Sequence, residues 1–188
     1  MEHAAPEGTG AMSAVLGLDA SVIEEVLDGR EGVSIANYNC PGQIVITGQA
    51  EAVAKAGEVL KEAGARRVLP LKVSGPFHSP MMRPAGEELA KVFAGVSMNP
   101  LKLPYVANIN AEVITDCGKI EELLVAQVSG SVRWQQSVET MIREGVDTFI
   151  EIGPGKTLTG FLRKIDKNVK SYHIGSWEEA VQVCEELK

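Results

Sequence analysis

The chain has 188 residues, 45% of them hydrophobic and 23% charged, and its formal net charge is −7. This length and apolar content predict a packed core in one domain or two small ones, and they exclude a disordered chain. The negative charge argues against an extended nucleic-acid footprint, so no nucleic-acid partner is expected. No apolar run approaches the ~20 residues that span a bilayer, and the first residues lack the regions of a signal peptide. We therefore expect a cytoplasmic protein with no membrane partner.

Three cysteines, Cys40, Cys117 and Cys184, are far apart in the sequence. An odd number of distant cysteines fits reduced thiols, and no CxxC pair offers a metal or redox motif. The sequence therefore predicts no metal site.

A short glycine-rich segment, Gly155-Lys156-Thr157, resembles the end of a phosphate-binding loop. That loop requires a glycine five residues earlier, where this chain has Ile150, and Pro154 removes an amide donor. We expect a sharp strand-to-helix turn here and no nucleotide site.

The first part of the chain alternates short β-branched runs with amphipathic stretches. The expected order is strand, helix, two strands, helix and strand, over residues 11–16, 20–28, 33–38, 43–47, 51–63 and 67–73. Asn39-Cys40-Pro41-Gly42 is a strong turn signal, so the two middle strands should form a hairpin. This order predicts a ferredoxin-like βαββαβ subdomain.

After Ser74 the pattern changes to longer helices and short, strongly apolar strands, which is typical of an α/β layer with a covered sheet. The fold class expected is α/β with an α+β small subdomain, divided into residues 8–74 and 75–188. The expected elements are helices behind residue 82, over 120–127 and over 134–142, strands over 103–109 and 146–152, and a last helix opened by a capping box of Ser176 and Glu179.

His78 stands between Pro76 and Pro80, directly ahead of an amphipathic helix. The prolines predict rigid, non-helical backbone around the histidine, so its ring direction is set by the chain. One interpretation is a histidine that caps or packs at a helix start. The other is an imidazole placed for proton transfer near neutral pH.

Five separated segments, in order along the chain, resemble malonyl-CoA:acyl carrier protein transacylases of the acyltransferase family. They are Glu7-Gly8-Thr9-Gly10-Ala11-Met12, the run from Asn37 to Gly48, Pro76-Phe77-His78-Ser79, Val132-Arg133-Trp134 with Ser137-Val138, and Glu151-Ile152-Gly153-Pro154-Gly155-Lys156. The resemblance implies a ferredoxin-like subdomain inserted into a hydrolase-like α/β core, of which this chain would carry the C-terminal part.

The resemblance also implies a chemistry. In the family a serine in a GxSxG elbow attacks malonyl-CoA, a histidine takes its proton, and the phosphopantetheine thiol of acyl carrier protein then attacks the acyl-enzyme. His78 matches that histidine, and Gln127 matches the residue whose main-chain carbonyl holds the other ring nitrogen, so the Gln127 side chain is expected to play no part. Without the resemblance, Gln127 is simply a polar residue at a helix C-terminus. The implied substrates are the coenzyme A thioester and the phosphopantetheinylated carrier, with no cofactor.

Two further residues match substrate-binding positions. Asn39 matches an asparagine beside the acyl pocket, although turn chemistry alone would also select an Asn before Cys-Pro-Gly. Phe77 resembles the variant that prefers malonyl over methylmalonyl units, because its ring fills the space of a 2-methyl group. One methyl is worth ~1 to 3 kcal/mol in such a pocket, so this would be a preference.

The departures from the family pattern are also informative. No GxSxG occurs among the 188 residues, and Met1 aligns just after the malonate-binding arginine of the family. Ser79, beside His78, is not expected to replace the nucleophile, because adjacent side chains in extended backbone point apart. We therefore expect a C-terminal portion that begins at an internal methionine and is inactive alone. It should also expose an apolar sheet edge or face.

Three other functions stay open: a non-catalytic module that binds acyl carrier protein, an acyltransferase piece of a polyketide synthase, and a small-molecule regulatory domain. An acidic carrier needs a basic surface, for which the candidates are Arg66, Arg67, Arg133, Lys156, Arg163 and Lys164.

Overall fold

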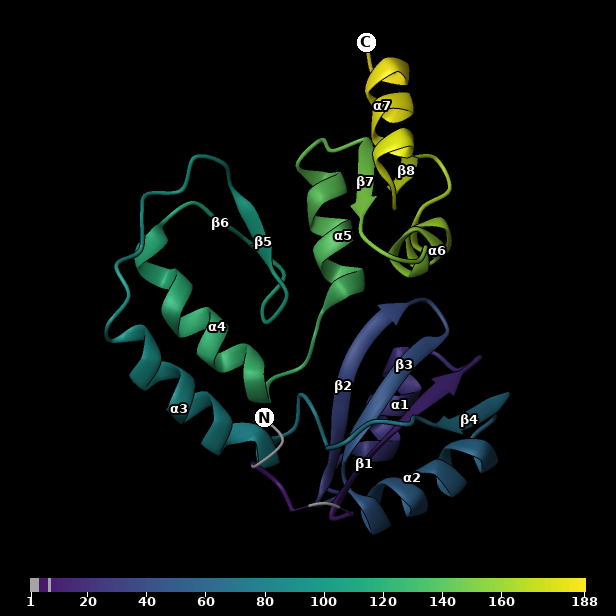
Figure 1. Cartoon of the computed structure of the whole chain (residues 1–188). Helices are drawn as coiled ribbons and strands as arrows, with labels where there is room; N and C mark the ends of the chain where they lie inside the picture. The colour runs from purple at the N-terminus through teal and green to yellow at the C-terminus, as the bar shows by residue number, and fades with distance from the viewer. Residues whose placement is uncertain (1–3, 7) are drawn as a thin grey trace.

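A computed structural model describes residues 4–6 and 8–188, in three groups of elements that follow one another along the chain (Figure 1). Met1 and Glu7, which entered the comparison with the family, lie outside the described residues. The first group contains β1 (Gly10–Leu16), α1 (Ala20–Leu27), β2 (Val33–Cys40), β3 (Gln43–Gln49), α2 (Ala50–Glu62) and β4 (Arg67–Pro70).

The first group is an antiparallel sheet of order β2-β3-β1-β4 with two helices on one face. This is the strand order of a ferredoxin-like fold, so the predicted βαββαβ arrangement is confirmed. Pro41 and Gly42 form the hairpin turn, and Gly42 takes the positive φ of 72° that the turn requires. Strand β4 is shorter than predicted and ends at Pro70, although Leu71 N still donates to Met12 O at 2.9 Å.

The two faces of this sheet bury different groups, because successive side chains of a strand point to opposite faces. One face packs against α1 and α2 through a continuous core. The other face carries a smaller apolar cluster of Met12, Ala14, Ala36 and Val45, against which Phe77 packs. The segment that follows the subdomain is thus anchored on the face that the helices leave free.

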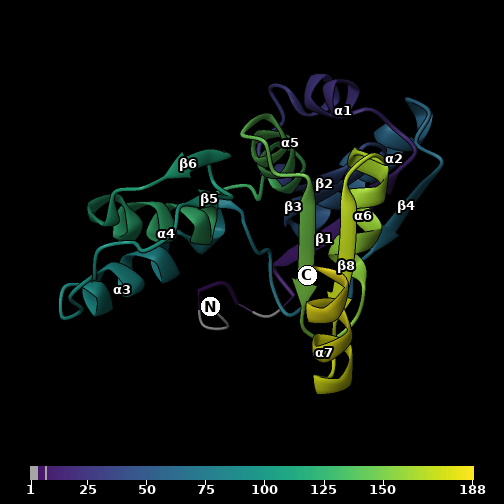
Figure 2. The same ribbon diagram turned by 90° about the horizontal axis from the view of Figure 1, so that it is seen from above.

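The second group contains η1 (Pro80–Met82), α3 (Arg83–Phe93), β5 (Tyr105–Ala107), β6 (Glu112–Ile114), η2 (Cys117–Lys119) and α4 (Ile120–Ser129). Helices α3 and α4 lie side by side, apart from β7 and β8, in both views (Figure 2). The strand predicted over 103–109 is only the three residues of β5, and its antiparallel partner β6 was not predicted. A strand of three residues is too short to show a periodic pattern.

The third group contains α5 (Trp134–Arg143), β7 (Thr148–Ile152), α6 (Thr157–Ile165), β8 (Lys170–Ile174) and α7 (Trp177–Glu186). Strands β7 and β8 are parallel neighbours, joined through α6. Strand β8 was not predicted, because its sequence KSYHI mixes polar and apolar residues. The segment between β7 and α6 is the strand-to-helix turn that was expected.

Residues 131–132 connect the third group to the first by pairing with the edge strand β2. Val132 N donates to Ala36 O at 2.7 Å, and Tyr38 N donates to Val132 O at 2.8 Å. The hydroxyl of Ser131 adds a bond to Ile35 O at 2.6 Å. These hydrogen bonds join residues on the two sides of the predicted division at residue 74. The division into two subdomains therefore stays a prediction.

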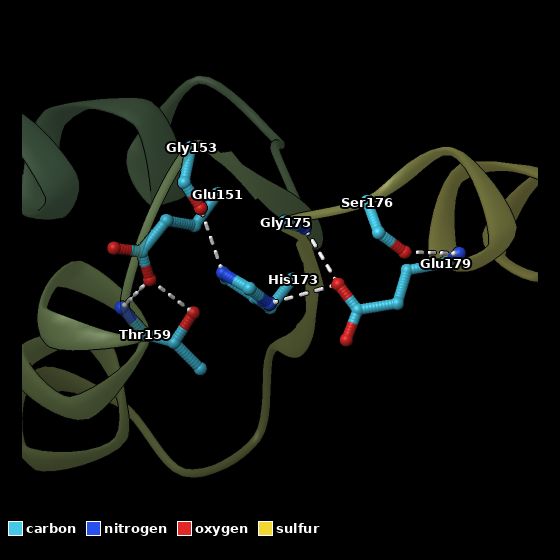
Figure 3. A network of polar contacts seen from close by, with 7 residues as sticks. All are labelled: Glu151, Gly153, Thr159, His173, Gly175, Ser176 and Glu179. Carbon is cyan, nitrogen blue, oxygen red and sulfur yellow. Dashed lines mark hydrogen bonds and ion pairs between the residues drawn. The ribbon is translucent and has the colours of Figure 1, made fainter.

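A polar network joins β7, α6, β8 and α7 (Figure 3). Glu151 caps the N-terminus of α6 from the preceding strand: it accepts from Leu158 N at 3.1 Å, from Thr159 N at 2.7 Å and from the Thr159 hydroxyl at 2.6 Å. Burial acts to raise the pKa of this carboxyl, but these hydrogen bonds and the nearby His173 outweigh it and leave the pKa lowered.

The same network contains a second histidine, whose side chain is only 10% exposed. His173 Nε2 donates to Gly153 O at 2.9 Å, and Nδ1 lies 3.5 Å from a Glu179 carboxylate oxygen. That carboxylate accepts from Gly175 N at 2.6 Å, while the Ser176 hydroxyl accepts from Glu179 N at 3.2 Å. The predicted cap at Ser176 is therefore present, with the glutamate reaching Gly175 in place of the cap residue itself.

Among the described residues 4–6 and 8–188, no helix combines the length and the apolar character needed to cross a membrane. The third group nevertheless exposes apolar side chains. Ile152 of β7 is 77% exposed and Trp177 is 78% exposed, and β8 is the strand that pairs with β7. Parallel strands are usually covered on both faces, so this surface favours association.

We expect the 188-residue chain to self-associate through the exposed face of β7. Ile152→Lys should lower the association, because a charged side chain on this apolar face would have to be buried against the second chain. Light scattering after size exclusion, over a range of protein concentrations, measures the mass. Ser97→Lys adds the same charge at an exposed position outside β7 and should have no such effect. A concentration-independent monomer of the unchanged chain would contradict the expectation.

Glu151→Gln should weaken the cap of α6, because it places an amide NH2 opposite a backbone N–H. We expect the free energy of unfolding to fall by about 1 kcal/mol near neutral pH. The folded pKa of Glu151 is lowered, so its contribution is present above the unfolded-state pKa and is lost as pH falls through the folded pKa. The gap between parent and variant should therefore close on acidification.

Urea unfolding curves at a series of pH values, from about pH 7 to about pH 3, measure this gap. Glu185→Gln, at an exposed position of α7, is the matched control. A gap that stays constant with pH would show that the Glu151 carboxylate does not carry the effect.

Candidate active site

His78 lies in a turn that forces an uncommon backbone conformation on it. Its φ is 57°, in the left-handed region that favours glycine. The backbone here is non-helical, as expected, but His78 is not extended, as was assumed for it together with Ser79. The residues that precede prolines are Gly75 and Ser79, and Ser79 is indeed extended with φ −118° and ψ 163°. A proline restricts the backbone of the residue before it, and His78 precedes Ser79. Neither proline therefore prevents His78 from adopting a positive φ.

Ser79 holds this turn closed. Its buried hydroxyl donates to Pro76 O at 2.7 Å and accepts from Met81 N at 3.3 Å, which caps the short helix η1. The hydroxyl beside His78 is thus occupied by structural bonds.

The residues before His78 fix the turn to the sheet. A Cβ on Gly10 of β1 would lie 2.3 Å from Pro76 Cδ, so the proline ring rests on backbone that only glycine can provide. Phe77 packs on the small apolar cluster of the same sheet. The direction of the His78 ring is therefore set by the ferredoxin-like subdomain.

His78 contacts the end of α4 from this position. Nδ1 lies 3.0 Å from the main-chain oxygen of Gln127. A carbonyl only accepts, so Nδ1 carries the proton in this contact, and Nε2 of the neutral ring is left as a bare acceptor. The last four carbonyls of a helix have no helical partner, which explains why this oxygen is available. The arrangement can take up a proton at Nε2.

The Gln127 side chain is also hydrogen-bonded, which leaves untested the expectation that it plays no part in the chemistry. Its Nε2 donates to Gly130 O at 2.9 Å and to Ser131 O at 3.2 Å. Sequence reasoning missed these bonds, although they reach only three and four residues along the chain, because the resemblance gave a role to the main-chain oxygen of Gln127 alone.

Asn39 lies on β2, the strand with which residues 131–132 pair. It follows Tyr38 on β2, whose amide donates to Val132, and it sits in an irregular stretch of the strand next to Cys40. Its side chain is half-buried. The structure therefore groups His78, Phe77 and Gln127 directly, and it relates Asn39 to them through β2 and residues 131–132.

Two of the six basic candidates lie beside the end of β2. The Arg133 guanidinium stands over the Tyr38 ring, 5.5 Å from its centroid. Burial, the hydrogen bond to Glu24 and the charge of Glu24 together raise the pKa of Tyr38 to about 12, against the opposing charge of Arg133. Burial likewise raises the pKa of the Cys40 thiol, and Lys164 acts in the opposite direction.

No group of three or more His, Cys, Asp and Glu side chains in the described part of the chain could hold a metal ion.

Comparison with known proteins gives the family. Residues 1–183 match the acyl transferase domain family. The malonyl CoA-acyl carrier protein transacylase of Bacillus subtilis (strain 168) is 44% identical over 192 residues, which cover all of this chain and 61% of the relative.

Solved structures agree. The malonyl CoA-acyl carrier protein transacylase from Clostridium perfringens matches with a TM-score of 0.94 and 41% identity, over all of this chain and 60% of that one. A malonyl-transacylase solved in complex with a type II PKS acyl-carrier protein matches with a TM-score of 0.91 and 38% identity, over 98% of this chain and 61% of that one. The chain spans about three fifths of these relatives, and it belongs to the acyl transferase domain family.

Proposed function

We propose that this chain takes part in transferring a malonyl group from malonyl-CoA to the phosphopantetheine thiol of an acyl carrier protein, and that it supplies the general base. The observation that carries the proposal is the 3.0 Å contact between His78 Nδ1 and Gln127 O, which leaves Nε2 as the proton acceptor. The names of the relatives, malonyl transacylases at 38–44% identity, support the substrate class.

In the proposed reaction, a serine hydroxyl attacks the thioester carbonyl while His78 Nε2 takes the hydroxyl proton. The C–S bond then breaks, and the imidazolium returns the proton to the leaving coenzyme A sulfur. The second half runs in reverse: His78 takes the proton of the carrier thiol as its sulfur attacks the serine ester, and returns it to the serine oxygen. No GxSxG segment occurs among these 188 residues, so the serine must be supplied from outside them.

Phe77 and Asn39 are the proposed acyl-pocket residues. Phe77 is held against the apolar cluster of the sheet, so its ring is not free to swing away from a bulkier acyl group. A 2-methyl group would therefore lower transfer by roughly 10- to 200-fold. Asn39 would contribute an amide to the malonyl group from the end of β2.

The partner proposed is an acyl carrier protein, and a fatty acid or a polyketide pathway fits equally. A second candidate function, a non-catalytic module that binds the carrier, is favoured by the position of Arg133 and Lys164 beside β2, since a basic surface suits an acidic carrier. Salt-sensitive binding of the carrier without any transfer would support that alternative.

The proposal predicts how transfer depends on the histidines. The isolated chain should form no malonyl ester with malonyl-CoA in an intact-mass measurement. Transfer to the carrier should begin when the remaining part of the Bacillus subtilis relative, which by resemblance carries the serine, is folded together with this chain. His78→Ala should lower that transfer by about 10² to 10⁴-fold, since a positioned general base contributes this much.

His173→Ala is the matched control, because His173 belongs to the network between β7, β8 and α7 and should not affect transfer beyond its effect on folding. Radiolabelled malonyl-CoA and the holo-carrier give the rate. A stoichiometric serine ester on the isolated chain, or equal rates for the parent and His78→Ala, would overturn the proposal.

A further inference from the structure

We propose that the side chain of Gln127 is a positioning residue for His78: it ties the carbonyl that orients the imidazole to the edge strand β2 of the ferredoxin-like subdomain. This inference rests on the proposed function, because it gives a role to the tautomer of a general base. Any residue could offer the main-chain oxygen that contacts His78, so that contact does not explain why residue 127 is a glutamine.

Gln127 makes two kinds of contact from one residue. Its main-chain oxygen faces His78 Nδ1 at 3.0 Å, while its side-chain Nε2 donates to Gly130 O at 2.9 Å and to Ser131 O at 3.2 Å. An amide NH2 has two hydrogens, and both are used here. Rotation of the side chain would therefore break two bonds at once.

The segment that the side chain holds is itself fixed to β2. Ser131 donates from its hydroxyl to Ile35 O at 2.6 Å, and Val132 exchanges backbone bonds with Ala36 and Tyr38 at 2.7 and 2.8 Å. A continuous series of hydrogen bonds thus runs from β2 through residues 131–132 and the Gln127 amide to the His78 ring.

The end of α4 needs such a support. Helix termini fray, and Gly130, the residue that ends α4, has extended backbone with φ −104° and ψ 158°. A Cβ on Gly130 would lie 3.0 Å from Ala126 O and 2.2 Å from Ile109 Cδ1, so a side chain here would force the Ile109 side chain to move. The bonds of the Gln127 amide close this turn over the last helical residues. Without them the Gln127 carbonyl could tilt away from the imidazole.

The residue type follows from this geometry. Any residue offers a main-chain carbonyl, but two acceptor oxygens require a side chain with two donors at the right length. Glutamate would place a carboxylate oxygen against two carbonyl oxygens, and alanine would leave both without the donor. Gln127 Oε1 is buried without a partner in the described structure, so burial of this amide is offset by its Nε2 bonds alone.

The test reads the tautomer of His78 directly, in the 188-residue chain labelled with ¹⁵N in the histidine rings. The chain has three histidines, which makes the long-range ¹H–¹⁵N spectrum assignable by substitution. Above the titration range, His78 should carry its proton on Nδ1. His173 should carry its proton on Nε2, because Nε2 faces Gly153 O, and it serves as the internal reference.

In Gln127→Glu and Gln127→Ala, the His78 signals should move to the averaged tautomers of an unrestrained imidazole. Exchange of the Nδ1 proton with solvent should accelerate about tenfold, as expected for the loss of hydrogen bonds that hold the site. The His173 signals should not move. Gln182→Ala, at an exposed glutamine of α7, is the matched control and should leave both histidines unchanged.

Folded Gln127 variants with the parent tautomer and the parent exchange rate would overturn the inference and leave the general-base assignment standing. Should both Gln127 variants fail to fold, Ser131→Ala removes one bond to β2 without touching the amide: a smaller shift in the same direction supports the inference, and no shift overturns it. A parent chain whose His78 carries its proton on Nε2 would overturn both the inference and the proposed base. Absence of His78-dependent transfer together with the tautomer shift would overturn the proposed function alone.

Discussion

The pairing of residues 131–132 with the edge strand β2 is the constraint on which the arrangement around His78 depends. An unpaired strand edge presents free amides and carbonyls, and here Val132, in the connection between α4 and α5, pairs with two of those of β2, Ala36 O and Tyr38 N. The same bonds fix where α4 ends. The acceptor for His78 is one of the carbonyls at that end, so the edge strand and the imidazole are positioned relative to each other by one short segment.

The His78 turn is the second half of this arrangement, and it is held from the opposite side. A non-glycine residue in the left-handed region costs on the order of 1–3 kcal/mol and persists only where its surroundings determine it. Three contacts do so: Ser79 closes the turn on Pro76, Pro76 rests on Gly10, and Phe77 packs on the small apolar cluster. The His78 ring and the carbonyl that it contacts are therefore both held in place by the same antiparallel sheet.

Local sequence patterns predicted the elements of this sheet, because half-buried strands and amphipathic helices place their apolar residues at regular spacings along the sequence. The βαββαβ order, the hairpin at Pro41 and Gly42 and the cap at Ser176 follow from such signals. The short strands β6 and β8 carry too little periodicity to be seen.

Contacts between distant segments leave no local trace at all. The bond from Ser131 to Ile35 joins residues 96 positions apart, and the bond from His78 to Gln127 joins residues 49 apart. The resemblance to a known family supplied the second of these pairs. It could not supply the side-chain role of Gln127, because a role assigned to a main-chain atom says nothing about why the residue is glutamine.

The two histidines of the described structure show how much the choice of ring nitrogen decides. The His173 side chain is only 10% exposed; its Nε2 donates to a carbonyl and its Nδ1 lies near the Glu179 carboxylate, so both nitrogens face the protein. His78 uses Nδ1 for a carbonyl at a helix end and is only partly buried, so Nε2 is the nitrogen left for a reacting group. Two imidazoles with the same intrinsic chemistry therefore differ in role. The ring nitrogen that meets a main-chain oxygen decides which of them is a structural residue and which is a candidate base.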